Sequence, residues 1–315
     1  MTHIGGFFEL EPVSGDGADM HASALALHNG RACLMVMLSD LSPRRVWVPH
    51  YTCDATLQPF RETGCDMRFY AIGDRFEPLD IPPLQEGEYL LYTNYFGLCE
   101  RAIDDLKAKL GDRLLVDDTH AFFRGRREGL WSFTSARKYF GVPDGAYLYA
   151  PKPLALTPQA FEAISTEHLR LRQEGRQAEA FAAYQRYERS LDTRVFGISD
   201  FSRERLSHID YAAVAAARRH NFMHLDQALS ASNRLKLPLE ASVPFCYPYL
   251  PVAPVAHARL YERGIYPPKL WADMLERDVP AWERELAETL LPLPVDHRYG
   301  TDAMDAIVDA LGVSR

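Results

Sequence analysis

The sequence predicts an α/β fold with a mostly parallel sheet, and two features indicate it. In the first half, short apolar runs typical of buried strands alternate with stretches of helical spacing, as in βαβ units. The second half is dominated by long helical stretches and turns to a mixed pattern after Pro238. We therefore expect a large domain over residues 1–200 and a small α+β domain over residues 201–315.

The first helix is expected to start at Gly30, directly after the turn residue Asn29. Its exposed amides and positive dipole end would meet an anion, although a glycine turn opening an ordinary core helix explains the same residues equally well. The further strands of the first half are expected at 46–48, 67–72, 89–94, 114–116 and 146–149, and the further helices at 52–62 and 102–110.

In the second half, helices are expected at 178–191, 212–229, 255–263 and 301–311, and strands at 243–247 and from 264 onward. Long amphipathic helices of this kind join domains or bury apolar faces between subunits. The proline-rich corner 267–271 contains Trp271, which would either present an aromatic platform to a substrate or simply pack in the core.

The composition excludes several classes of protein. The formal net charge of −8, with no basic stripe carrying interleaved aromatic residues, argues against a nucleic-acid partner. No apolar run is long enough to span a bilayer, and the N-terminus lacks a signal-peptide pattern. The five cysteines are scattered without metal-ligand spacing, which indicates mostly buried, reduced thiols and no metal site. We expect a cytoplasmic protein with no membrane partner.

Two short segments carry the groups that pyridoxal phosphate requires. Asp117 ends the apolar run 114–116, and His120 follows three residues later. Ser135 and Lys138 lie further along the chain. A lysine amine forms an imine with the cofactor aldehyde, and a carboxylate beside the pyridine nitrogen keeps that nitrogen protonated. Because ligands collect at the carboxyl ends of parallel strands, Asp117 would emerge at such a site.

The sequence thus predicts a pyridoxal phosphate protein with Lys138 and Asp117 as its catalytic residues. His120 would bond the ring hydroxyl, and Ser135, one helical turn before Lys138, would donate to the phosphate. Each residue alone has a simpler explanation, since an Asp ending a strand is usually a turn or cap residue and a single lysine is usually solvated. The order of these residues, followed by a Gly/Pro turn at 141–145 and a strand, favours the cofactor site.

Residues 25–150 resemble the DegT/StrS-type sugar aminotransferases, which have the three-layer, aspartate-aminotransferase-like fold type I. Five segments carry the resemblance. Residues 29–34 match the family's glycine turn, 48–56 its proline-to-threonine segment and 93–97 its next strand end. Residues 117–122 match its Asp-x-x-Gln/His-Ala-Phe signature, and 135–145 match its lysine segment. The resemblance implies the roles above for Asp117, His120 and Lys138. It further implies cofactor contacts from Gly30, Arg31 and Ser135, which would hold the phosphate, and from Cys53 and Asn94.

Two family features have no clear counterpart here. Cys53 stands where the family has a flat ring stacked on the cofactor, with Tyr51 or Tyr95 as candidate replacements. The family's glycine-asparagine-x-arginine segment, which reaches the neighbouring subunit's phosphate, has its nearest counterpart at 199–203.

The activity implied by the resemblance is amino transfer from an amino acid, for which we expect glutamate, to a keto sugar nucleotide. Arg31, Arg124 and Arg137 are candidates to bind the donor's carboxylate. Relatives of this fold build each active site from two subunits, so a homodimer is expected. A non-catalytic or regulatory module stays open, although retention of Lys138, Asp117 and His120 together argues against it. A pyridoxal phosphate-dependent lyase or dehydratase on the same scaffold stays open as well.

Overall fold

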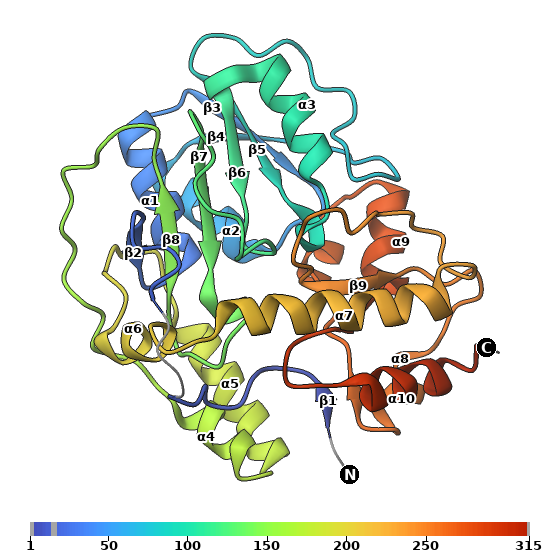
Figure 1. Ribbon diagram of the computed structural model, residues 1–315. Helices are drawn as coiled ribbons and strands as arrows, with labels where there is room; N and C mark the ends of the chain where they lie inside the picture. Colours follow the sequence, from blue (N-terminus) through green and yellow to red (C-terminus); the bar gives the residue numbers. More distant parts are fainter. Residues whose placement is uncertain (1–2, 14–17, 314–315) are drawn as a thin grey trace.

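The computed structural model describes residues 3–13 and 18–313 of the chain, and a seven-stranded sheet forms its centre (Figure 1). The strand order is β2-β8-β7-β6-β5-β3-β4. β8 runs antiparallel to both of its neighbours, whereas all other pairings of this sheet are parallel. The prediction of a mostly parallel α/β sheet is confirmed. The strands are β2 (Leu25–Leu27), β3 (Arg45–Pro49), β4 (Asp66–Tyr70), β5 (Glu88–Thr93), β6 (Leu114–Asp117), β7 (Trp131–Ser135) and β8 (Ala146–Tyr149).

Helices cover both faces of this sheet. Leu91 and Leu115 lie in one buried cluster with the side chains of α1 (Gly30–Leu41) and α2 (Asp54–Thr63). The residues that alternate with them, Leu90 and Leu114, lie in a second cluster with α3 (Glu100–Leu110) and with much of the second half. Because successive side chains of a strand point to opposite faces, this division gives three layers. A strand buried on both faces reads as a continuous apolar run, as β6 does.

The second half consists mainly of helices and two small pairs of strands. β9 (Cys246–Tyr249) pairs antiparallel with β11 (Leu291–Pro294), and β1 (Ile4–Gly5) pairs parallel with β10 (Ile265–Tyr266). The helices are α4 (Glu167–Gln173), α5 (Gln177–Ser190), α6 (Asp200–Leu206), α7 (Tyr211–Leu229), α8 (His257–Tyr261), α9 (Ala281–Thr289) and α10 (Thr301–Leu311). Short 3-10 turns are η1 (Tyr95–Gly97), η2 (Gly111–Arg113), η3 (Ala136–Lys138) and η4 (Ala272–Glu276).

The long helix α7 joins the two parts of the molecule, running beneath the central sheet from α6 toward the lobe that holds α9 and α10 (Figure 1). Its buried positions include Phe222, Leu225 and Leu229, which belong to the same cluster as residues of β5, β6 and α3. This confirms the predicted helix over 212–229. The polar Asn221 on the same face is also satisfied, since its Nδ2 donates to the carbonyl oxygen of Tyr299 at 2.9 Å.

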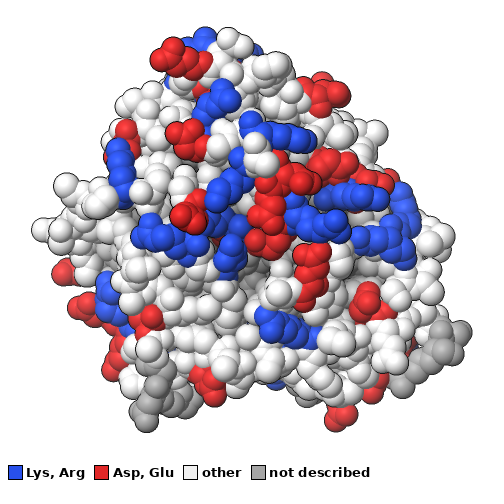
Figure 2. Space-filling view, turned by 45° about the horizontal axis from the view of Figure 1, so that its top comes forward, with Lys and Arg blue, Asp and Glu red and all other residues white. Residues whose placement is uncertain are grey.

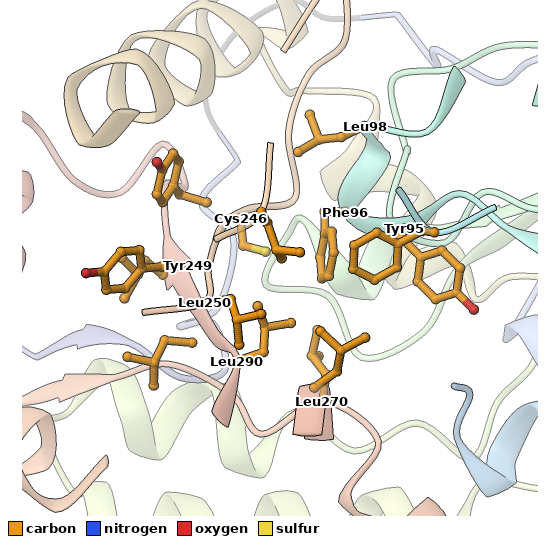
Figure 3. Close-up of a cluster of buried hydrophobic side chains, with 14 of the residues drawn as sticks. Tyr95, Phe96, Leu98, Cys246, Tyr249, Leu250, Leu270 and Leu290 are labelled. Atoms are coloured by element: carbon orange, nitrogen blue, oxygen red, sulfur yellow. The ribbon is translucent and has the colours of Figure 1, made fainter. Parts of the chain in front are cut away.

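The two halves share one core. Figure 3 shows side chains from the segment that follows β5 packed against side chains of the second half, among them Tyr95, Phe96 and Leu98 with Cys246, Leu250, Leu270 and Leu290. The N-terminal strand β1 pairs with β10, so the first residues of the chain lie with the second half. The expected boundary between residues 200 and 201 falls at the start of α6, and the division into two domains stays a prediction.

Two local predictions were wrong. Ser135 is the last residue of β7 and Lys138 ends the 3-10 turn η3, so these residues are not separated by one turn of an α-helix. The residues of β7 pair antiparallel with β8, and this long-range pairing determines their conformation. The strand expected at 243–247 begins only at Cys246, and Phe245 instead donates its N–H to the carbonyl oxygen of Phe96 at 2.9 Å.

The surface carries charged side chains of both signs. Figure 2 shows Lys and Arg side chains interspersed with Asp and Glu side chains on the face drawn there. Charged side chains of the described residues also form ion pairs, such as Arg45 with Asp66 at 2.6 Å. All five cysteines are free thiols, three of them buried. In the described part of the chain, no helix is long and apolar enough to cross a membrane.

Candidate active site

The predicted site residues lie at one edge of the sheet. Cys53 follows β3 and Asn94 follows β5. Asp117 is the last residue of β6, and Ser135 is the last residue of β7. These strands are parallel, so their carboxyl ends meet at a common edge. β2 is separated from β7 by two antiparallel pairings and therefore has the same direction, which places the start of α1 at this edge too.

Asp117 is a buried acid at the end of β6. Its side chain accepts a hydrogen bond from the N–H of Thr119 at 2.9 Å, and the residue is 4% exposed. Burial raises its pKa to about 6, while the Thr119 hydrogen bonds and the positive charge of Lys138 act in the opposite direction. Among the described residues no Lys, Arg or His nitrogen lies within 4.0 Å of this carboxylate. A cationic group placed beside it would stabilise its ionised form.

A buried ion-pair network holds the turn that carries Asp117. Arg127 donates to Asp118 at 2.6 and 2.7 Å and to Glu100 at 2.7 and 3.0 Å. Asn94 donates to both acids through Nδ2, and its Oδ1 accepts from the N–H of Cys99 at 3.0 Å. Asn94 was predicted to contact the cofactor, but both polar atoms of its side chain form hydrogen bonds within this network. Sequence reasoning missed the network, because nothing local connects residues so far apart in the chain.

His120 lies within a stack of aromatic rings. Its ring is almost parallel to those of Phe245, at a centroid distance of 4.2 Å, and Trp271, at 5.4 Å. Its Nδ1 accepts from the N–H of Phe96 at 3.4 Å. Burial, with a further contribution from the charge of Lys138, lowers the pKa of His120 well below its ordinary value, so the imidazole is neutral.

Phe245 was not predicted as a site residue, whereas Trp271 was considered either as an aromatic platform for a substrate or as a core residue; both come from the second half of the chain. Trp271 has φ 56° and ψ 37°, a left-handed conformation that costs energy for a bulky residue and persists only where its surroundings hold it. Tyr51 packs edge-on against Trp271 at 4.5 Å. The corner 267–271 thus packs directly on the candidate site. Its closeness to the histidine could not be foreseen, since only the tertiary fold brings the two together.

Lys138 lies beside the aromatic stack around His120. Its Nζ is 5.9 Å from the ring centroid of Phe245, the ring that stacks on His120, and the residue is half-buried. Its charge acts on both Asp117 and His120. The structure therefore brings together the amine, the carboxylate and the imidazole that the sequence placed in two separate segments.

The start of α1 lies against the turn that follows β6. A methyl group added to Gly30 would lie 3.4 Å from the ring of Phe133 and 3.9 Å from the side chain of Thr119. Asn29 caps the helix by accepting from the N–H of Ala32 at 2.8 Å. The next residue, Arg31, has a buried Nε with no hydrogen-bond partner in the described part of the chain. The helix end, this guanidinium and the Asp117 turn form one region.

The side chains of the other predicted cofactor contacts, Ser135 and Cys53, form only weak hydrogen bonds within the described part of the chain. Ser135 donates only a long hydrogen bond, 3.5 Å to the carbonyl oxygen of Gly145, which leaves its hydroxyl able to bond elsewhere. Cys53 is partly exposed at the start of α2, with its Sγ 3.3 Å from Oγ1 of Thr56. No cluster of His, Cys, Asp and Glu in the described chain could hold a metal ion.

Comparisons with known proteins support this architecture. Neither a protein-family model nor a curated protein matches the sequence. Solved structures do match, among them the sugar aminotransferase CalS13 from Micromonospora echinospora, with 16% identity and a TM-score of 0.60 over 91% of this chain and 86% of that one. The chain has the fold of this aminotransferase.

Two further structures of this fold agree. A DegT DnrJ EryC1 StrS aminotransferase from Brucella abortus has 16% identity and a TM-score of 0.59, covering 92% of this chain and 85% of its own. DesI, solved in the presence of its TDP-sugar product, has 15% identity and a TM-score of 0.57, covering 91% of this chain and 79% of its own. The structural likeness thus extends beyond residues 25–150, which carry the resemblance in sequence. The predicted fold type I architecture is confirmed.

The residues present fit pyridoxal phosphate. This cofactor offers a ring nitrogen, a ring hydroxyl, an aldehyde and a phosphate, and binding it takes a carboxylate, a hydrogen-bonding side chain, an amine and an anion site. Asp117, His120, Lys138 and the start of α1 supply these groups at one edge of the sheet. The observation that decides the fit is Asp117, a buried acid without a cation at contact distance in the described part of the structure.

Proposed function

We propose that this protein is a pyridoxal phosphate-dependent aminotransferase that moves an amino group from glutamate to a keto sugar nucleotide. The observation that carries the proposal is the meeting of the Lys138 amine, the Asp117 carboxylate and the neutral His120 at the carboxyl edge of the sheet. The fold shared with sugar aminotransferases supports it.

Pyridoxal phosphate, when bound, supplies an aldehyde that bonds covalently to amines and a ring that withdraws electrons. Asp117 would hold a proton at the ring nitrogen, because a carboxylate beside this atom favours its protonated form. The protonated ring nitrogen beside Asp117 would also lower the pKa of this carboxyl, which burial has raised, and so would stabilise its ionised form. Binding and activation would thus come from the same contact.

Lys138 would bond to the cofactor aldehyde and, once released by the amino acid, move a proton through its Nζ. Its position over Phe245 keeps the amine on the side of the site that the second half covers. His120 would hydrogen-bond the ring hydroxyl. Phe245 and Trp271 enclose this imidazole and would exclude water from that side of the ring.

The phosphate would lie at the start of α1, where the helix dipole favours an anion, with Gly30, Arg31 and Ser135 as its proposed contacts. Gly30 suits this position because its missing side chain leaves the helix end open next to Thr119. The buried, unpartnered Nε of Arg31 is a donor that lacks an acceptor, and a phosphate oxygen would provide one.

The substrates are inferred from the neighbouring structures. DesI was solved with its TDP-sugar product, and CalS13 is a sugar aminotransferase, which supports a keto sugar nucleotide as acceptor. Of the arginines considered for the donor carboxylate, Arg124 is bound to Glu100 at 3.4 Å and Arg137 to Glu188. We further propose a homodimer of cytoplasmic location, consistent with the second-subunit residues expected for this fold.

The experiment that tests the function is a half-reaction. Protein loaded with pyridoxal phosphate is mixed with glutamate, and the absorbance of the cofactor is followed together with release of 2-oxoglutarate. An aminotransferase converts the bound cofactor to its amine form and releases one equivalent of the keto acid. Loss of the amino acid's carboxylate as carbon dioxide, or an unchanged cofactor, would favour a lyase or a binding module instead.

A further inference from the structure

A carboxylate from α5 lies among three cations of the proposed active site, Arg137, Lys138 and Arg31. Glu188, in the last turn of α5, forms an ion pair with Arg137, which directly precedes Lys138. The side chains of Arg137 and Glu188 are 17% and 32% exposed, so the pair lies largely out of solvent. The guanidinium also lies 5.7 Å from the ring centroid of Tyr187, which limits where it can move.

Three positive charges act on Glu188. Although burial acts in the opposite direction, the charges of Arg137, Lys138 and Arg31 hold the pKa of Glu188 below its ordinary value. The Nε atoms of Arg31 and Arg137 are nevertheless buried without hydrogen-bond partners in the part of the chain that is described. The Glu188 carboxylate therefore balances part of the positive charge of this cluster, and the Nε–H groups of Arg31 and Arg137 remain as donors for a second acceptor.

The chain that follows Glu188 is fixed over the start of α1. Asn29, the residue that caps this helix, donates through Nδ2 to the carbonyl oxygen of Asp192 at 3.0 Å. Thr193 bonds to Glu62 of α2. The chain four residues beyond Glu188 is thus held at the start of α1, where an anion would meet the first amides of the helix.

We propose that Glu188 is a built-in counter-anion, which balances Arg137 and Arg31 in the cofactor-free protein and competes with the phosphate group of the cofactor for them. This inference rests on the proposed function, because it concerns the phosphate of pyridoxal phosphate. A phosphate group that arrives beside an ionised carboxylate must either displace it from Arg137 or tolerate its repulsion. Glu188 would therefore set how strongly the protein retains its cofactor.

The first test is a pair of titrations, with pyridoxal phosphate and with pyridoxal, which lacks the phosphate. They are made with the wild type, Glu188→Gln and Glu179→Gln, and binding is followed by absorbance. Glu179 is the matched control, since it lies on the same helix and pairs with Arg176 in a fully exposed position. We expect Glu188→Gln to bind pyridoxal phosphate about tenfold more tightly, with pyridoxal unchanged. An unchanged affinity, or an equal gain with pyridoxal, would overturn the inference.

The second test needs no cofactor. Thermal unfolding is measured in chloride and in inorganic phosphate at equal ionic strength. Glu188→Gln should unfold at lower temperature than the wild type in chloride, because Arg137 loses its counter-charge, and should regain stability in phosphate. Equal instability in both buffers would overturn the inference. If the wild type fails to bind pyridoxal phosphate at all, the proposed function is wrong, and the phosphate buffer still decides whether Glu188 occupies an anion site.

Discussion

Arg127 donates to both carboxylate oxygens of Asp118, at 2.6 and 2.7 Å, and both side chains are almost completely buried. The backbone of Asp118 is also bonded to β7, since its N–H donates to the carbonyl oxygen of Phe133 at 2.8 Å. The turn between Asp117 and His120 is therefore fixed from two sides. A cofactor that contacts both of these residues would meet them in a prearranged position.

Replacing Arg127 by Ala should cost about 3–5 kcal/mol of unfolding free energy, because Asp118 would stay buried without a counter-charge. The control is Arg186→Ala, which breaks an exposed pair with Glu167 and should cost about 1 kcal/mol or less. Denaturant unfolding measures both values. A loss for Arg127→Ala no larger than that of the control would show that the network does not hold the turn.

Asp117 should destabilise the cofactor-free protein at neutral pH. Below about pH 4 the carboxyl is protonated in both states and contributes nothing. Between about pH 4 and 6 the unfolded chain ionises while the folded one keeps its proton, so stability falls as pH rises. Above pH 6 the loss is complete, at about 2–3 kcal/mol.

Asp117→Asn removes this titration and should raise the unfolding free energy at pH 7 by about 2 kcal/mol, while it abolishes turnover. The measurement is denaturant unfolding between pH 4 and 8 without cofactor, with the exposed Asp112→Asn as control. If the asparagine variant shows the same decline between pH 4 and 6 as the wild type, the raised pKa of Asp117 does not cause that decline.

Trp271 should report on the site through its fluorescence. Its ring stacks on His120 at 5.4 Å, so a cofactor bound beside this imidazole would quench its emission. Trp271→Phe should remove most of the quenching that pyridoxal phosphate produces. The control is Trp282, whose indole N–H donates to the carbonyl oxygen of Gly73 at 3.1 Å. Trp282→Phe should retain the quenching. Equal quenching in both variants would place the cofactor away from Trp271.

Local patterns predicted much of the fold and part of the site. The apolar run of β6 is buried on both faces and ends in Asp117, as expected of a central parallel strand. The helix predicted from Gly30 begins at that residue, because Asn29 supplies the cap. The strand over 46–48 and the helices over 102–110 and 212–229 also formed where their periodicity placed them.

What the sequence could not provide depends on partners far away in the chain. The conformation of Ser135 is determined by its pairing with Ala146 across the sheet, and its own neighbours did not indicate a strand. Arg127, Phe245 and Glu188 reach the site only through the tertiary fold, and each has an ordinary local context. Periodicity reports which face a residue shares with its neighbours, and it carries no information on these contacts.

The most direct test of the account is the absorbance spectrum of the protein after addition of pyridoxal phosphate and removal of excess. We predict a visible band in the wild type and in Lys152→Ala, which loses only an exposed amine paired with Asp40 at 2.8 Å. Lys138→Ala should lack this band, and reduction with borohydride followed by peptide mapping should place the cofactor on Lys138 in the wild type. A band that persists in Lys138→Ala, or a reduced cofactor found on another lysine, would contradict the account.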